Sequence, residues 1–300
     1  MEKDKFSLKE GNTPLVKAIK IPFYLNNNIE LYFKREDKNP NGTWIDRYVN
    51  KKIESIMLKN SEGILAYGHS REFITSLASY TARLGVNLYL FVSKKEYENY
   101  NFSMFLVFDL KIIVVDGEKK DIINHLKKIE SIYPLNYVEY YEDNDVIENL
   151  MFEVENEIEK VDYVFMNIDK NNTIYYNILY DYFNKKNIKF IGVTLDENIS
   201  KEKKITLIEN YEVEIAYQSL LKNEGIIATK EIAICFAGVD NYDKTMGFEE
   251  NSNVLQILKK DNTQTLKKIY NSMRIDLNIS TIDIGYDNFL EILKLKKIEV

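Results

Sequence analysis

Apolar and polar residues alternate along the first 132 positions of the chain in two distinct periods. Short apolar runs predict buried strands at residues 31–33, 64–67, 87–93 and 112–115. Patterns of helical period separate these runs and predict helices over residues 44–58, 71–84, 96–110 and 119–132. Gly85 follows the second helix as a C-cap.

The second half repeats the alternation less regularly. Apolar runs predict strands at 163–168 and 188–194, and helical patterns cover 146–158, 173–185, 200–222 and 255–273. Residues 232–237 fit a helix or a strand. The acidic tract 137–145 lacks a period and is interpreted as a crossing between two domains. Strands that alternate with helices predict an α/β fold with open, mostly parallel sheets.

Composition excludes several classes of function. The net charge is −7 and the basic residues are scattered, so a nucleic-acid-binding surface is not expected. No apolar run approaches the roughly 20 residues of a membrane span, and the N-terminal residues do not resemble a signal peptide, so we expect a cytoplasmic protein. The single cysteine, Cys235, lies in an apolar run and is expected to be buried and inert. With His69 and His125 as the two histidines, we expect no His/Cys metal site.

The stretch from Leu31 to Arg47 combines a short strand, an Asn-Pro-Asn-Gly turn and the start of a helix, for which Thr43 is the expected N-cap. It contains Lys34, Glu36, Asn39, Pro40, Gly42, Thr43, Trp44, Asp46 and Arg47. In this register it resembles the K-x-E-x-x-N-P-[TS]-G-[ST]-[FW]-K-D-R segment of threonine synthases and related fold-type II pyridoxal-phosphate (PLP) enzymes. An upstream run, from Glu10 to Leu15, resembles the E-G-N-T-P-L signature of threonine synthase.

The resemblance implies a two-domain architecture in which each domain has its own sheet. A small domain at 48–140 would be inserted in a large domain formed by residues 1–47 and 141–300. It also implies a homodimer, or pairing with a paralogous enzyme.

Ile45 stands where the family has the lysine that forms the Schiff base with PLP. An isoleucine has no amine, so it cannot bind the cofactor covalently. Lys38 precedes the turn and Lys51 lies nearly two helical turns later, so neither shares the direction of residue 45. We therefore predict no catalytic residue and no cofactor.

The family's S-S-G-N-T-G loop corresponds to the residues after the strand 64–67. In this chain His69 and Ser70 take the serine positions, Arg71 replaces glycine and Glu72 replaces the asparagine that contacts the cofactor ring. The bulky Phe73 and Ile74 follow, so Ser70 is the residue of this loop that matches the family. His69 is expected to be an exposed loop residue.

The glycine-rich phosphate loop of the family corresponds to the residues after the strand 163–168. This chain has no glycine there and reads Asp169, Lys170, Asn171, Asn172 and Thr173. A carboxylate about 4 Å from a phosphate charge is repelled by roughly 4 kcal/mol near a protein surface. Lys170 would offset part of this repulsion. We interpret Thr173 as the cap of an ordinary helix.

Three hypotheses follow from these exchanges. In the first, the chain is a threonine synthase-like pseudoenzyme without PLP, which acts as a scaffold or as a ligand-binding or regulatory partner for an unknown small molecule or protein. In the second, it is an active PLP-dependent threonine synthase or serine/threonine dehydratase with a rebuilt site. In the third, Glu72, Asp169, His69 and Arg71 support different acid–base chemistry. An open cleft lined by Glu72 and Asp169 would favour the third hypothesis over the first. A cleft plugged by Trp44, Ile45, Phe73 and Ile74 would favour the first.

Overall fold

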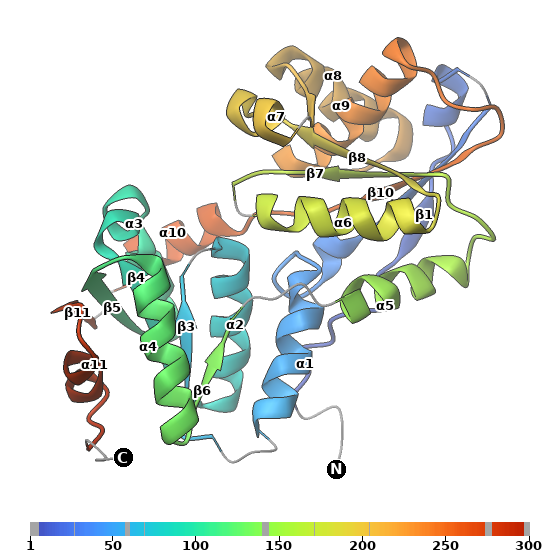
Figure 1. Ribbon diagram of the computed structural model, residues 1–300. Helices are drawn as coiled ribbons and strands as arrows, with labels where there is room; N and C mark the ends of the chain where they lie inside the picture. Colours follow the sequence, from blue (N-terminus) through green and yellow to red (C-terminus); the bar gives the residue numbers. More distant parts are fainter. Residues whose placement is uncertain are drawn as a thin grey trace. The chain divides into compact units, whose positions relative to one another are not determined.

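The computed structural model divides the chain into two compact units, each built around its own mostly parallel sheet (Figure 1). The large domain comprises Lys9–Tyr48 and Glu142–Asp261, and the small domain comprises Val49–Tyr141 and Asn262–Val300 with Met1–Leu8. The structure describes residues 6–26, 28–57, 61–68, 70–139, 144–170, 172–203, 205–273 and 278–296. The predicted α/β class is confirmed.

The large-domain sheet has the strand order β1-β2-β10-β7-β8-β9 in the part of the chain that the structure describes. Its strands are β1 (Leu15–Lys17), β2 (Glu30–Lys34), β7 (Tyr163–Asn167), β8 (Lys189–Thr194), β9 (Thr206–Leu207) and β10 (Asn253–Ile257). β1 is antiparallel to β2, whereas β2, β10, β7, β8 and β9 run parallel. The carboxyl ends of β2, β10 and β7 therefore lie side by side at one edge of the sheet.

Helices cover both faces of this sheet (Figure 1). The helical elements are η2 (Ile21–Tyr24), η3 (Glu36–Lys38), α5 (Asn144–Glu155), α6 (Thr173–Lys185), α7 (Glu197–Lys203), α8 (Asn210–Glu224) and α9 (Lys230–Thr245), with α1 (Ile45–Met57) beginning in this domain. The core on one face joins Phe33, Phe165 and Val193 of the strands to α8 and α9. Gly238 permits this packing, because a Cβ there would lie 2.3 Å from Val193 Cγ2.

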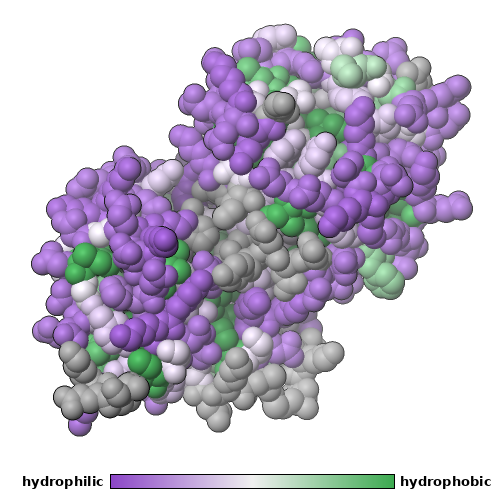
Figure 2. Space-filling model, in the orientation of Figure 1, coloured by the Kyte–Doolittle hydropathy of each residue, from purple (hydrophilic) through white to green (hydrophobic). Residues whose placement is uncertain are grey.

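The small-domain sheet has the order β11-β5-β4-β3-β6 among the described residues, and these neighbours are parallel. Its strands are β3 (Gly63–Tyr67), β4 (Leu88–Ser93), β5 (Lys111–Asp116), β6 (Leu135–Val138) and β11 (Ile279–Asp283). Its helical elements are α2 (Arg71–Leu84), α3 (Lys94–Asn99), η4 (Phe102–Phe108), α4 (Lys119–Ile132), α10 (Thr263–Ser272) and α11 (Tyr286–Ile292). On the face seen in Figure 2, hydrophilic residues cover most of the surface and hydrophobic residues form small patches.

The C-terminal residues correct the predicted domain boundaries. We assigned 262–300 to the large domain, but they belong to the small domain, where β11 pairs with β5 from Ile279↔Ile112 to Asp283↔Asp116. Residues 255–273 were predicted as a helix, yet β10 occupies the first part of that range and α10 begins at Thr263. The run Val254-Leu255-Gln256-Ile257 is fully or almost fully buried between β2 and β7, as expected for a central parallel strand.

Two further expectations are wrong in detail. The helix predicted at 96–110 is split into α3 and η4, because Asn101 caps a new turn by accepting a bond from Ser103 N. The helix predicted at 200–222 is split into α7, β9 and α8, and a capping box of Glu209 and Glu212 starts α8. The tract 137–145, which we interpreted as a crossing between two domains, contains the boundary between Tyr141 and Glu142. Its first residues belong to a strand, β6, and residues 140–143 lie outside the described part of the chain. Residues 232–237 lie in a helix, α9.

Candidate functional site

A buried network of charges joins the motif residues at the carboxyl end of β2. Arg47 donates to Glu36 through Nε (2.9 Å) and Nη2 (2.7 Å). The same guanidinium donates to Glu153 of α5 through Nη1 (2.5 Å) and Nη2 (2.9 Å). Lys34 Nζ donates to Glu153 Oε2 and to Thr13 O, both at 2.7 Å. Each buried cation therefore has a carboxylate partner.

The N-terminal motif is tied into the same network. Gly11 N donates to Asn39 Oδ1 (2.9 Å), and Asn39 Nδ2 donates to Glu36 Oε2 (2.7 Å). Asn12 N donates to Glu153 Oε1 (2.9 Å). These bonds link residues that are far apart in sequence, so the motif at residues 10–15 and the motif at residues 34–47 form one structural unit.

The electrostatics of the network favour its charged form. Burial by itself raises the pKa of Glu153, but the bonds from Arg47 and Lys34 hold this pKa at about 2. Burial by itself lowers the pKa of Arg47, and Glu153 and Glu36 raise it above its ordinary value. Removing one member of such a buried pair typically costs about 3–5 kcal/mol. These residues stabilise the fold of the large domain.

Position 45 is filled by a packed apolar side chain. Ile45 is the first residue of α1 and has no exposed surface. Trp44 beside it is also buried and meets Tyr175 of α6 edge-on, with ring centroids 5.8 Å apart and an interplanar angle of 87°. Both side chains therefore pack in the interior.

The residues after β3 belong to the small domain and form the start of a helix. Ser70 is the N-cap of α2 and accepts a bond from Phe73 N at 3.3 Å. Glu72 lies in the first turn and is 6% exposed, and Phe73 and Ile74 are buried. His69 lies outside the described residues. Trp44 and Ile45 thus belong to the large domain, whereas residues 70–74 belong to the small domain.

The loop after β7 is closed by its own hydrogen bonds. Asp169 N donates to Asn172 Oδ1 (2.6 Å), and Asn172 Nδ2 donates to Asn167 O (2.9 Å). The backbone N–H groups of Asn172 and Thr173 donate to Asp169 O at 3.1 and 3.0 Å. Asn172 is fully buried and is the N-cap residue of α6, so our assignment of Thr173 as the cap is wrong. Asn171 lies outside the described residues.

Lys259, like Glu153, is a residue of the candidate site that the sequence analysis missed. It follows β10, is 1% exposed, and its Nζ lies 2.8 Å from Asp169 Oδ2. We had expected Lys170 to offset the charge of Asp169, but this contact comes from Lys259. The signal was the mostly apolar run Val254–Leu258, which Gln256 interrupts but whose length fits a buried strand better than a helix.

The remaining titratable candidates have ordinary surroundings. Cys235 is 1% exposed and donates to Phe165 O at 3.5 Å, and burial raises the pKa of its thiol. His125 packs on Phe289 with ring centroids 5.0 Å apart, and burial lowers its pKa. Among the residues that the structure describes, no three His, Cys, Asp or Glu side chains are grouped to hold a metal ion.

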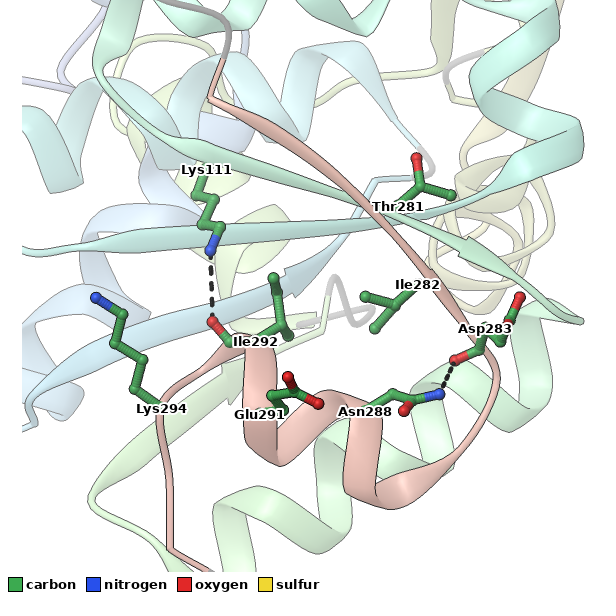
Figure 3. A pocket seen from close by; sticks show the side chains of 8 residues that line it. All are labelled: Lys111, Thr281, Ile282, Asp283, Asn288, Glu291, Ile292 and Lys294. Atoms are coloured by element: carbon green, nitrogen blue, oxygen red, sulfur yellow. Dashed lines mark hydrogen bonds between the residues drawn. The ribbon is translucent and has the colours of Figure 1, made fainter.

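A pocket of about 470 Å³ lies in the small domain beside β11 and α11 (Figure 3). Its lining residues are Lys111, Thr281, Ile282, Asp283, Asn288, Glu291, Ile292 and Lys294. Figure 3 shows two bonds there, from Lys111 Nζ to Ile292 O (3.4 Å) and from Asn288 Nδ2 to Asp283 O (3.1 Å). The charged side chains on its rim are accessible to water, which screens them, so we assign no chemistry to this pocket.

Within the described ranges, no helix is both long enough and apolar enough to cross a membrane.

Comparisons with known proteins agree with the motif resemblance. No protein-family model matches the chain. A threonine synthase from Bacillus sp. (strain ULM1) is 27% identical over 132 residues, which is 44% of this chain and 37% of that protein. A threonine synthase from Synechocystis sp. is 21% identical over 132 residues, covering 44% of this chain and 34% of that protein. Each match therefore spans little more than a third of the curated relative.

Solved structures match over much more of the chain. O-ureido-L-serine synthase has a TM-score of 0.61 at 13% identity, covering 88% of this chain and 93% of that one. A pyridoxal 5'-phosphate-dependent aspartate racemase has a TM-score of 0.59 at 15% identity, covering 87% and 93%. Cystathionine beta-synthase from Bacillus anthracis has a TM-score of 0.59 at 14% identity, covering 84% and 96%. The chain therefore has the fold of the fold-type II PLP-dependent enzymes and is a distant homologue of threonine synthase.

Proposed function

We propose that this chain is a threonine synthase-like protein that has lost PLP catalysis. It uses the fold as a scaffold, or as a ligand-binding or regulatory partner. The observation that carries the proposal is the loop after β7, in which Asp169 faces the buried Lys259 and the N–H groups of Asp169, Asn172 and Thr173 are bonded within the loop.

The residues present do not fit PLP. A phosphate at this loop would have to replace internal bonds of Asp169, Asn172 and Thr173, each worth about 0.5–1.5 kcal/mol net. It would also meet the carboxylate of Asp169, and like charges at short range repel. Ile45 supplies no amine for a covalent link. The loop and position 45 oppose the cofactor independently of each other.

A genetic experiment tests the loss of catalysis. We expect that the gene does not restore growth without threonine to a bacterial strain that lacks threonine synthase, even when the protein is abundant and folded. An active bacterial threonine synthase expressed from the same vector is the positive control. Growth supported by this chain, and lost on Lys259→Met, would overturn the proposal.

One observation favours the alternative of an active PLP enzyme. Lys259 is a buried lysine at the carboxyl edge of the sheet, where ligands of open α/β sheets bind. In this alternative its amine would have to leave Asp169. Reduction with borohydride after PLP treatment, followed by peptide mapping, distinguishes the two proposals, because a pyridoxyl group on Lys259 is expected under the alternative alone.

We further propose that the chain works as a homodimer or in a complex with a paralogous active enzyme. The support is the resemblance to threonine synthases, which implies a homodimer, together with the shared fold. Light scattering after size-exclusion chromatography tests the homodimer, and a mass of one chain at micromolar concentration would contradict it.

A further inference from the structure

The loop between β7 and α6 has a position in the fold that favours binding of an anion. It stands at the carboxyl edge of parallel strands and leads into the N-terminus of the 13-residue helix α6. Lys259 comes from the end of the adjacent strand, β10, and its ammonium is 1% exposed. A helix N-terminus and a buried cation together favour a negatively charged occupant.

We propose that the occupant of this anion site is the chain's own Asp169 carboxylate. The carboxylate oxygen Oδ2 lies 2.8 Å from Lys259 Nζ, and the Asp169 side chain is 33% exposed. The inference rests on the proposed function, since both concern this loop. It adds that the site still selects a small carboxylate anion, and that the chain itself supplies it.

Asn172 holds Asp169 in place for this role. Its Oδ1 accepts from Asp169 N, and its Nδ2 donates to Asn167 O at the end of β7. Asp169 O accepts from the N–H groups of Asn172 and Thr173. The backbone of Asp169 is therefore fixed on both sides, and its side chain is presented to Lys259.

The inference has a direct consequence for a variant without the carboxylate. In Asp169→Ala, the Lys259 ammonium stays buried without the carboxylate at 2.8 Å, and a small free carboxylate can take that position. Formate matches the removed group in charge and size. Inorganic phosphate is larger, so a weaker effect of phosphate is expected.

The experiment is a thermal unfolding series in sodium formate, with sodium chloride at equal ionic strength as the reference. For Asp169→Ala we expect a saturable rise of several degrees in the melting temperature that is specific to formate, with half-saturation in the millimolar range. The wild-type protein is expected to show no formate-specific rise. Asp162→Ala is the matched control, because its partner Lys160 is 76% exposed and needs no anion.

The double variant Asp169→Ala/Lys259→Met identifies the cation. It is expected to lose the response to formate. A folded Asp169→Ala protein that responds equally to formate and chloride would overturn the inference, as would a response that persists in the double variant or appears equally in the wild type.

If Asp169→Ala does not fold, Asp169→Asn keeps the shape of the side chain. We then expect Asp169→Asn/Lys259→Met to melt at a higher temperature than Asp169→Asn, and a lower temperature would overturn the inference. Binding of PLP by the wild type would overturn the proposed function, yet it would leave the formate comparison interpretable. The two failures are therefore distinguishable.

Discussion

The large domain contains two groups of charged residues at the carboxyl ends of its strands. The two groups differ in how well their residues match the family's motifs. The first group, which we call the motif network, consists of Thr13, Lys34, Glu36, Arg47 and Glu153. The second group, the β7 loop site, consists of Asp169, Asn172 and Lys259. The first four members of the motif network match the family's motifs, whereas Asp169 and Asn172 lie where the resemblance places the family's phosphate loop and do not match it.

The difference shows why a motif match reports the fold rather than the reaction. Thr13, Glu36 and Arg47 bond to each other and to α5, so the fold of the large domain needs them whether or not a cofactor binds. A phosphate loop has no such role, because its donors serve a ligand. In this chain the N–H groups of Asp169, Asn172 and Thr173 are instead bonded within the loop.

The largest expected effect comes from breaking the motif network. Arg47→Met should reduce the free energy of unfolding by about 3–5 kcal/mol, because the buried Glu36 loses its guanidinium partner. Urea denaturation measures this change. Arg35→Met is the control, since among the described residues Arg35 forms an ion pair with Asp37 alone and its side chain is 14% exposed. A loss below about 1 kcal/mol in Arg47→Met would contradict the structural role.

Restoring the family's lysine at position 45 tests whether this position alone, or the β7 loop as well, prevents PLP binding. Ile45→Lys places an amine at a site with no exposed surface, so we expect a loss of about 3 kcal/mol or more at pH 7 and a lowered pKa of the new lysine. We expect no PLP absorbance band, because the β7 loop stays closed. Ile45→Met is the control for packing. An aldimine band in Ile45→Lys would mean that position 45 alone had blocked the cofactor.

Acid should weaken the motif network in a defined range. The pKa of Glu153 is 4.5 in the unfolded chain and about 2 in the folded one, so its stabilising contribution is present above pH 4.5 and is lost as the pH falls towards 2. The expected loss is on the order of 3 kcal/mol. Unfolding experiments between pH 5 and pH 2 measure it as a slope, which Glu153→Gln should reduce. An unchanged slope in that variant would contradict the assignment.

The smallest expected effect is in the β7 loop. Asn172→Ala removes the bonds to Asp169 N and Asn167 O and should cost about 1–3 kcal/mol, the typical penalty for unpaired buried groups. Hydrogen exchange of the Asp169 amide should become faster. Asn184→Ala, near the other end of α6, is the control for a general effect on this helix. Equal exchange of the Asp169 amide in Asn172→Ala and the wild type would contradict the role of Asn172 in closing the loop.

Local patterns in the sequence predicted the α/β class and most strands of the first half, because buried parallel strands leave short apolar runs. The errors arose where context decides. β10 is a central strand, yet Gln256 interrupts its apolar run and Lys259 follows it, so its sequence resembled the start of a helix. β11 joins the small-domain sheet by pairing with β5, a long-range contact that no local pattern encodes.

The candidate site was also predictable only in part, because the sequence shows local exchanges but not long-range contacts. The exchanges at Ile45 and Asp169 are visible in the sequence once the resemblance fixes the register. The partner of Asp169 was not, because Lys259 is 90 residues away and reaches the loop through the order of strands in the sheet. Glu153 was missed likewise, since α5 brings it to Arg47 across 106 residues.

The central claim is that the β7 loop site no longer binds PLP, and an absorbance spectrum tests it most directly. The purified protein is incubated with PLP, passed through a gel-filtration column and scanned before and after borohydride reduction. We predict a colourless protein whose thermal unfolding is unchanged by PLP. A retained aldimine band that borohydride fixes to a lysine, Lys259 above all, would contradict the account.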